Sequence, residues 1–177
     1  MKEFETYFLY VGNAYPHKNL ERVIKVAAHS KVMFYIVSSR NMFTDRLEKI
    51  IKKNNAENYV KLLGFVEDEE LKELYRNSIG FIFPSLSEGF GLPGLEALKN
   101  GTVLLASNIA VFREIYGNHA IYFDPLDTQS IENAVQKTLG LTRLEGEKMI
   151  RENREFVKKY SWKKMAQETL EVYKSLS

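Results

Sequence analysis

Short, continuously apolar runs alternate along this sequence with segments that have the periodicity of a helix. The strand-like runs lie at residues 7–12, 32–37, 60–64, 80–83, 103–106 and 121–123. Strands that are apolar throughout are typical of a parallel sheet whose two faces are both covered. The sequence therefore predicts the α/β class, as a single doubly wound, Rossmann-like domain with a parallel sheet over residues 1–177.

Segments between these runs carry apolar stripes with helical spacing. The first stripe consists of Leu20, Val23, Ile24, Ala27 and Ala28. These positions, i, i+3, i+4, i+7 and i+8, fall on one face of a helix. From residue 128 onward the pattern is helical throughout. The last stripe follows Ser161, a favourable N-cap residue, and it consists of Trp162, Met165, Ala166, Leu170 and Tyr173.

Composition excludes several classes of function. The formal net charge is +2, which gives no reason to expect a nucleic-acid partner. The sequence has no cysteine, so it has neither disulfide bonds nor thiolate chemistry. No apolar stretch approaches the ~18 residues of a membrane-spanning helix. We therefore expect no transmembrane segment, and we expect no signal peptide.

A glycine-rich loop follows the run at residues 80–83 and leads into a helix. Pro84 ends the strand, and Pro93 lies where the first turn of the helix tolerates a missing N–H. The start of such a helix offers free backbone N–H groups and a partial positive charge, which together favour a phosphate. Two carboxylates, Glu88 and Glu96, flank this helix start.

The glycines at 89, 91 and 94 also satisfy the pattern G-x-G-x-x-G. As a dinucleotide fingerprint the pattern is weak, because that fingerprint belongs on the first strand and requires an acidic residue about 20 positions further on. Here it follows a late strand, and the next strand ends in Ala106, Ser107 and Asn108, without an acid. A tight turn with close helix packing and a phosphate cradle therefore both stay open as interpretations.

The charged residues near this loop each allow a structural and a functional interpretation. Glu96 is either a partner of the helix dipole or an acceptor of hydrogen bonds from a vicinal diol such as ribose. Glu88 could hold a sugar hydroxyl. Lys18, at the start of the first helix, is either solvated or a point charge on an anion that it shares with the glycine loop.

No metal site is predicted. The acidic run at residues 67–70 is typical of the first turn of a helix. The three histidines, His17, His29 and His119, do not have the spacing of metal ligands, and no D-x-D motif is present to hold a metal between phosphates. No serine–histidine–acid arrangement can be argued.

These features resemble the C-terminal, donor-binding half of retaining glycosyltransferases with the GT-B fold, in glycosyltransferase family 4 (group 1). The central feature is Glu88-x7-Glu96, with the core Ser-Glu-Gly-Phe-Gly-Leu-Pro at residues 87–93. Supporting features are Val11-Gly12 with Lys18-Asn19 downstream, Leu63-Gly64-Phe65-Val66, Gly101-Thr102-Val103 and Tyr160-Ser161-Trp162. The likeness extends over nearly the whole chain.

The resemblance implies a role for each matching residue. Lys18 is expected to bind the donor's diphosphate and to neutralise the leaving group, and Glu88 to lie beside the donor sugar. These two are the candidate catalytic residues. Glu96 is expected to hold the ribose hydroxyls. The other expected donor-binding positions are Gly12 and Asn13 after the first strand, Phe65 and Val66 at the nucleobase, and the backbone N–H groups of Gly89, Phe90, Gly91 and Leu92 at the sugar and phosphate.

The resemblance also implies an activity. It is the transfer of a hexose, with mannose or glucose favoured, from a GDP-, UDP- or ADP-linked donor to a saccharide or lipid-linked acceptor. The anomeric configuration is retained, and neither a metal nor a cofactor is expected. The donor's own phosphate would help to deprotonate the acceptor, so no covalent role is expected for Glu88. The expected location is the cytoplasm, including its membrane face through peripheral association of the full-length protein.

Two departures from the family pattern keep an alternative open. Asn13 stands where family members often carry arginine, which removes one positive charge from the diphosphate site; Arg40 and His17 are candidates to compensate. The acceptor-binding N-terminal domain of the fold is missing from this chain, so the isolated domain is expected to be inactive or nearly so. The alternative is a non-catalytic nucleotide-sugar-binding module or one subunit of a two-chain transferase, and a nicotinamide-dependent domain is disfavoured by the missing acid.

Overall fold

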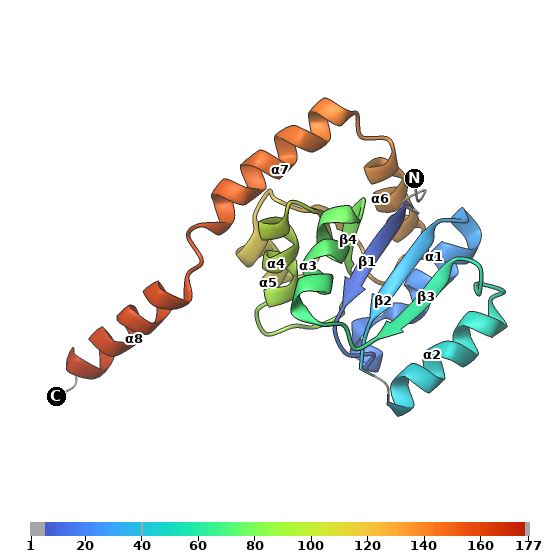
Figure 1. The fold of residues 1–177 in the computed structure, drawn as a ribbon, viewed down its shortest axis with the longest axis horizontal. Coiled ribbons are helices and arrows are strands. Elements are labelled where there is room, and N and C mark those ends of the chain that lie inside the picture. The colour runs from blue at the N-terminus through green and yellow to red at the C-terminus, as the bar shows by residue number, and fades with distance from the viewer. Residues whose placement is uncertain (1–5, 40, 176–177) are drawn as a thin grey trace.

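The fold is organised around a six-stranded, wholly parallel sheet with the strand order β3-β2-β1-β4-β5-β6. It is seen in a computed structural model that describes residues 6–39 and 41–175 (Figure 1). The strands are β1 (Tyr7–Val11), β2 (Met33–Val37), β3 (Val60–Gly64), β4 (Gly80–Phe83), β5 (Val103–Ser107) and β6 (Ile121–Phe123). The predicted fold class is confirmed.

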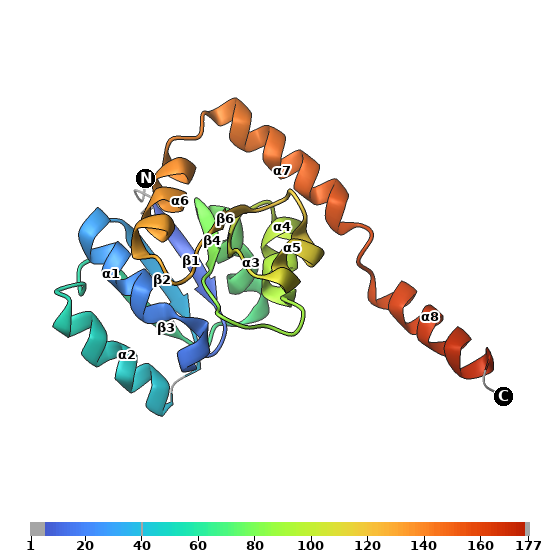
Figure 2. The same ribbon diagram turned by 180° about the vertical axis from the view of Figure 1, so that it is seen from behind.

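Helices connect the strands and continue beyond the last one. They are the 3₁₀-helix η1 (Pro16–Lys18) and the α-helices α1 (Leu20–Ser30), α2 (Met42–Lys53), α3 (Asp68–Asn77), α4 (Leu92–Asn100), α5 (Ala110–Tyr116), α6 (Thr128–Leu139), α7 (Arg143–Val157) and α8 (Trp162–Ser175). Figure 2 shows α1 and α6 over one face of the sheet, with α2 beside α1, whereas α3 and α4 cover the other face. Helix α7 packs along α4, and α8 extends away from the body (Figure 1).

Aromatic side chains fill much of the core between the sheet and the helices. Phe8 of β1 stacks on Phe34 of β2 with their ring centroids 5.2 Å apart, and both are fully buried. Phe83 of β4 lies 4.7 Å from the ring of Phe112 on α5. Buried aromatic rings of this size contribute much of the apolar area that a domain of this length removes from water.

Helix α5 is an α-helix that the sequence analysis did not assign. It begins after Ile109 without a side-chain cap and ends at Gly117 after only seven residues. Its buried residues are Phe112, Ile115 and Tyr116, whose spacing is helical but too short to stand out as a stripe. Tertiary packing therefore stabilises a helix that local sequence signals mark only weakly.

The order of the strands creates a switch point between β1 and β4. The chain lays β2 and β3 on one side of β1 and then returns to place β4 on the other side. Ligands in open parallel sheets bind outside the carboxyl ends of the strands at such a point. The loops after residues 11 and 83 are consequently neighbours, as the sequence predicted.

Within the described part of the chain, none of the helices combines the length and the apolar character needed to cross a bilayer.

Candidate functional site

The loops that follow β1 and β4 are joined by backbone as well as by side chains. The backbone N–H of Leu86, in the loop after β4, donates to the carbonyl oxygen of His17 in η1 at 2.8 Å. This bond fixes the glycine-rich loop against the 3₁₀ turn that carries Lys18. Lys18 closes that turn, two residues before helix α1 begins at Leu20.

Lys18 and Glu88 form a partly buried ion pair at this junction. The Lys18 ammonium donates to Glu88 Oε1 at 2.5 Å, and the Ser85 hydroxyl donates to the same oxygen at 2.7 Å. The two charged side chains are only 12% and 13% exposed. A pair of this kind is weakly screened by salt and holds a fixed geometry. The structure thus brings together the two residues expected to be catalytic, whose roles stay predictions.

Lys18 has donor capacity beyond this pair. An ammonium has three N–H donors, and Glu88 Oε1 is the partner of one of them. The ring of Phe83 lies beneath the ammonium, with its centroid 5.8 Å from Nζ. An anion placed over the glycine loop could therefore share the ammonium with Glu88 without breaking the ion pair.

Close packing explains two glycines of the loop. Gly91 has φ = +99° at the N-cap of α4, and its carbonyl oxygen accepts a hydrogen bond from the Tyr116 hydroxyl at 2.5 Å. A Cβ at Gly91 or at Gly94 would overlap the hydroxyl of Tyr116. A Cβ at Gly89 would meet nothing within 4 Å. The tight-turn interpretation is therefore confirmed at Gly91 and Gly94, whereas Gly89 is open on its outer side.

Helix α4 begins at Leu92 with Pro93 in its first turn, as predicted. Phe90, which lies just before this helix, and Leu92, its first residue, are both exposed. Such a start presents unpaired N–H groups and the positive end of the helix dipole. The geometry is compatible with a phosphate cradle at residues 89–92, which stays a prediction.

Glu96 lies about one turn into α4 and faces Tyr75 of α3. The Tyr75 hydroxyl is 3.4 Å from Glu96 Oε2 and 3.5 Å from the carbonyl oxygen of Pro93. Burial raises the pKa of the Glu96 carboxyl, and the hydrogen bond from Tyr75 opposes this shift. Burial also raises the pKa of Tyr75, which keeps that hydroxyl protonated as a donor. The predicted ribose contact of Glu96 is not tested by these contacts.

Gly12 and Asn13 lie at the end of β1. A Cβ at Gly12, where φ is +149°, would come within 2.9 Å of the Tyr10 hydroxyl, and that hydroxyl donates to the carbonyl oxygen of Asn13 at 2.7 Å. The Asn13 side chain is exposed, and so is His17. Arg40, the other residue considered as a replacement for the missing arginine, lies outside the described residues.

Phe65 and Val66 directly follow β3. Strand β3 is two places from β1 in the sheet, which corresponds to about 10 Å at the usual strand spacing. Phe65 is 73% exposed, and Val66 is buried in the core. The structure places both at the same edge of the sheet as Lys18 but not in contact with it, so the nucleobase slot stays a prediction.

Asn19 is a buried polar residue of the site that the sequence analysis did not single out as functional. Its side-chain amide joins three segments of the chain. The signal in the sequence is slight: an asparagine between Lys18 and the first apolar residue of α1.

The absence of a metal stays a prediction. Over residues 6–39 and 41–175, His, Cys, Asp and Glu do not gather in any group of three or more that could hold a metal ion. Asp68, Glu69 and Glu70 lie in the first turn of α3, as expected of dipole partners.

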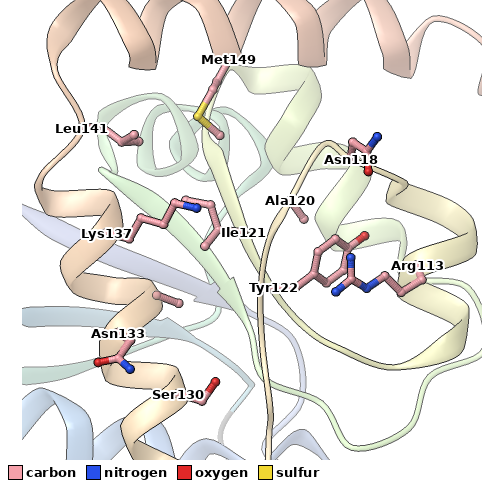
Figure 3. Close-up of a pocket in the computed structure, with 11 residues that line it drawn as sticks. Arg113, Asn118, Ala120, Ile121, Tyr122, Ser130, Asn133, Lys137, Leu141 and Met149 are labelled. Carbon is pink, nitrogen blue, oxygen red and sulfur yellow. The ribbon is translucent and has the colours of Figure 1, made fainter.

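A separate hollow of about 510 Å³ opens at the outer edge of the sheet, beside β6 (Figure 3). Lys137 of α6 and Met149 of α7 line it, and the guanidinium of Arg113 lies 3.7 Å from the centroid of the Tyr122 ring. A second hollow, of about 440 Å³, lies beside η1 and includes Asn19, Arg22 and Leu86. The first hollow contains none of the predicted site residues.

The six-stranded parallel sheet with helices on both faces defines the chain as a doubly wound, Rossmann-like α/β domain. Residues 2–156 match the family described as glycosyl transferases group 1. The chain belongs to that family. The predicted resemblance is therefore confirmed.

Two named relatives of this chain are mannosyltransferases. The chain is 36% identical to the O-antigen chain mannosyltransferase RfbU of Salmonella typhimurium, over 76% of this chain and 39% of that protein. It is 28% identical to the O-antigen chain mannosyltransferase B of Escherichia coli, over 98% of this chain and 47% of that protein. The chain thus spans less than half the length of these relatives.

A solved structure shows the same fold. The sucrose-phosphate synthase from Thermosynechococcus elongatus superposes with a TM-score of 0.88, covering 97% of this chain and 45% of that one at 24% identity. At this level of identity, the likeness establishes the architecture and leaves the substrate open.

Proposed function

We propose that residues 1–177 are the donor-binding domain of a retaining glycosyltransferase that transfers a hexose, with mannose favoured, from a nucleoside diphosphate sugar. The observation that carries the proposal is the Lys18–Glu88 ion pair, held against a glycine-rich helix start at the switch point of the sheet. Membership of the group 1 family and the printed activities of two relatives, both mannosyltransferases, support it.

Fixed positive groups would do the chemical work at the leaving diphosphate. As the bond from the sugar to the diphosphate breaks, negative charge grows on the phosphate oxygens. The Lys18 ammonium and the backbone N–H groups of residues 89–92 would stabilise that charge without reorganising, and no metal is needed for this step. The donor would be GDP-, UDP- or ADP-linked, with no further cofactor.

Glu88 would orient the donor sugar and would not act as a nucleophile. Its Oε1 already accepts hydrogen bonds from Lys18 and Ser85, which lowers the electron density available for attack. Deprotonation of the acceptor falls to the donor's own phosphate on the same face of the sugar. Glu96 would hold the ribose hydroxyls, and Phe65 and Val66 would line the nucleobase slot.

The acceptor would be a saccharide or a lipid-linked saccharide, bound by a second domain. This chain covers 47% of the length of its Escherichia coli relative, and we assign acceptor binding to the remaining part of such a protein. By itself the chain would bind a donor and transfer nothing. The whole enzyme would work in the cytoplasm, at the cytosolic membrane face if the acceptor is lipid-linked.

A second candidate is a non-catalytic nucleotide-sugar-binding module, or one subunit of a two-chain transferase. The exposed Asn13, in a position where arginine is common, favours it because one phosphate charge would be uncompensated. Supplying the acceptor-binding domain distinguishes the two candidates: transfer of sugar by the assembled protein supports the enzyme, whereas donor binding without transfer supports the module.

Calorimetry on this chain tests donor binding directly. We expect Glu96→Ala to weaken binding of a nucleoside diphosphate and its sugar alike, whereas Glu88→Ala should weaken only the nucleotide sugar. Lys18→Met should weaken both by about tenfold or more, as expected for a charge-assisted contact. The exposed lysine Lys25 of α1 provides a matched control, Lys25→Met, with no expected effect.

Three results would contradict the proposal. They are binding of NAD in preference to every nucleoside diphosphate sugar, equal losses for Glu88→Ala and Glu96→Ala, and a Lys18→Met variant that binds as well as the original.

A further inference from the structure

Asn19 occupies a strained backbone position directly after Lys18. It has φ = +58° and ψ = +26°, in the left-handed region, and its side chain is almost completely buried, with 4% of the residue exposed. Asparagine tolerates this region better than other residues with a Cβ, but glycine occupies it freely. An asparagine here therefore suggests that its side chain has a role.

The side-chain amide of Asn19 bridges two loops at the site. Its Nδ2 donates to the carbonyl oxygen of Pro84 at 3.0 Å and to that of Pro125 at 2.8 Å. Pro84 follows β4 and directly precedes Ser85, whose hydroxyl holds Glu88. Pro125 follows β6. The Asn19 amide thus connects the backbone next to Lys18 to the loops that follow β4 and β6.

Arg22 fixes which way this amide points. Its Nη1 donates to Asn19 Oδ1 at 2.7 Å from the first turn of α1. A guanidinium can only donate, so it must face the amide oxygen, and the NH₂ group must then face the two prolyl carbonyls. Both donors and the acceptor of the Asn19 side chain are used, which makes the arrangement specific.

We propose that Asn19, oriented by Arg22, is a positioning residue that holds the Lys18 ammonium over the glycine loop. This rests on the proposed function, in which Lys18 binds the donor diphosphate. A lysine side chain loses much rotational freedom when it is fixed on a ligand. A clamp that fixes the backbone of Lys18 against the loops after β4 and β6 removes part of that loss before the ligand arrives.

A double-mutant cycle separates positioning from a merely structural role. Asn19→Gly keeps the left-handed backbone and removes the amide. We expect it to weaken binding of GDP, UDP or ADP, whichever the chain binds, by about tenfold when Lys18 is present. In a Lys18→Met background the same change should cost less than about twofold. The same loss in both backgrounds would overturn the proposal.

Asn55 supplies a matched control. It also has a left-handed backbone, with φ = +52°, but its side chain is exposed. Asn55→Gly makes the same replacement without removing a buried bridge, and it should leave nucleotide binding unchanged. Arg22→Met serves as the second variant should Asn19→Gly fail to fold, and it should weaken binding in the same Lys18-dependent way.

Hydrogen exchange in the free protein tests the bridge without any ligand. Asn19→Gly should speed exchange at two backbone amides in particular: Leu86, which is bonded to His17, and Leu126, which is bonded to Asp124. Unchanged exchange at both amides would overturn the bridge. A wild-type chain that binds no nucleoside diphosphate would overturn the proposed function instead, so the two failures are distinguishable.

Discussion

Helices α4 and α8 have similar sequence patterns, but one is buried in the fold and the other is exposed. Both carry apolar residues at helical spacing, and both form helices where predicted. In α4, Leu95, Ala97 and Leu98 are buried among α3, α7 and the sheet. In α8 every described residue is exposed, with Trp162 at 70%. Figure 1 shows α8 projecting from the rest of the molecule.

The difference lies in what surrounds each helix. Helix α4 is fixed at both ends, by Gly91 under the Tyr116 hydroxyl and by Gly101 in a left-handed C-cap. Helix α8 follows α7 through residues 158–161, and the Lys164 N–H lies 3.4 Å from the hydroxyl of Ser161, the predicted N-cap. Local signals therefore suffice to make a helix, whereas burial requires a complementary surface.

Two helical glycines should respond to alanine in opposite directions. Gly94→Ala in α4 would place a methyl group on the Tyr116 hydroxyl and ring, and we expect it to lower the free energy of unfolding by about 2–3 kcal/mol. Gly146→Ala in α7, the helix that leads to α8, enters open space and should raise it by about 0.5–1 kcal/mol. Urea denaturation measures both.

If Gly94→Ala is neutral, Tyr116 can move aside, and close packing does not account for that glycine.

Two leucine truncations test the comparison between the helices themselves. Leu98→Ala in α4 empties a fully buried site and should cost about 2–5 kcal/mol in the free energy of unfolding. Leu170→Ala in α8, where the side chain is 52% exposed, should change it by less than about 0.5 kcal/mol. Comparable costs for the two variants would show that α8 packs against the body in solution.

The smallest effect concerns a carboxylate on each helix. Burial raises the pKa of Glu96 in the folded protein, so the folded state holds this proton to higher pH than the unfolded state does. Ionising Glu96 therefore costs stability as pH rises above about 4. Glu96→Gln should raise the free energy of unfolding at pH 7 by about 0.5 kcal/mol and should change it little at pH 3. The effect is small because water still reaches the carboxylate and screens it.

Glu168→Gln on α8 is the control for this titration. It removes a carboxylate whose ion pair with Lys164 is largely exposed, and its effect should be small at both pH values. A Glu96→Gln gain that is equal at pH 3 and pH 7 would contradict the explanation by partial desolvation of the Glu96 carboxylate.

Much of the fold could be predicted because its signals are local. Apolar runs fixed the six strands within one or two residues, and Pro93 and Gly101 marked the ends of α4. Helix α5 was missed because its seven residues include only three buried ones and no capping side chain. Its stability comes from packing such as the contact between Phe112 and Phe83.

The candidate site also has a part that could be predicted from the sequence and a part that could not. Lys18 and Glu88 could be paired in advance, since both follow strands that a doubly wound sheet brings together at one edge. Asn19 could not, because its partners Pro84 and Pro125 lie 65 and 106 residues away and offer only backbone carbonyls. Any residue can present a carbonyl, so the sequence contains no pattern that identifies them.

By itself, the sequence determined the parallel sheet, the position of the glycine loop and the family, because apolar periodicity and a motif of closely spaced residues are local properties of the chain. Only the tertiary structure decided that Tyr116 requires the glycines at 91 and 94, that Asn19 bridges three segments, and that α8 is left uncovered. Each of these depends on how close distant segments come in space, and that is set by the packing of the whole molecule.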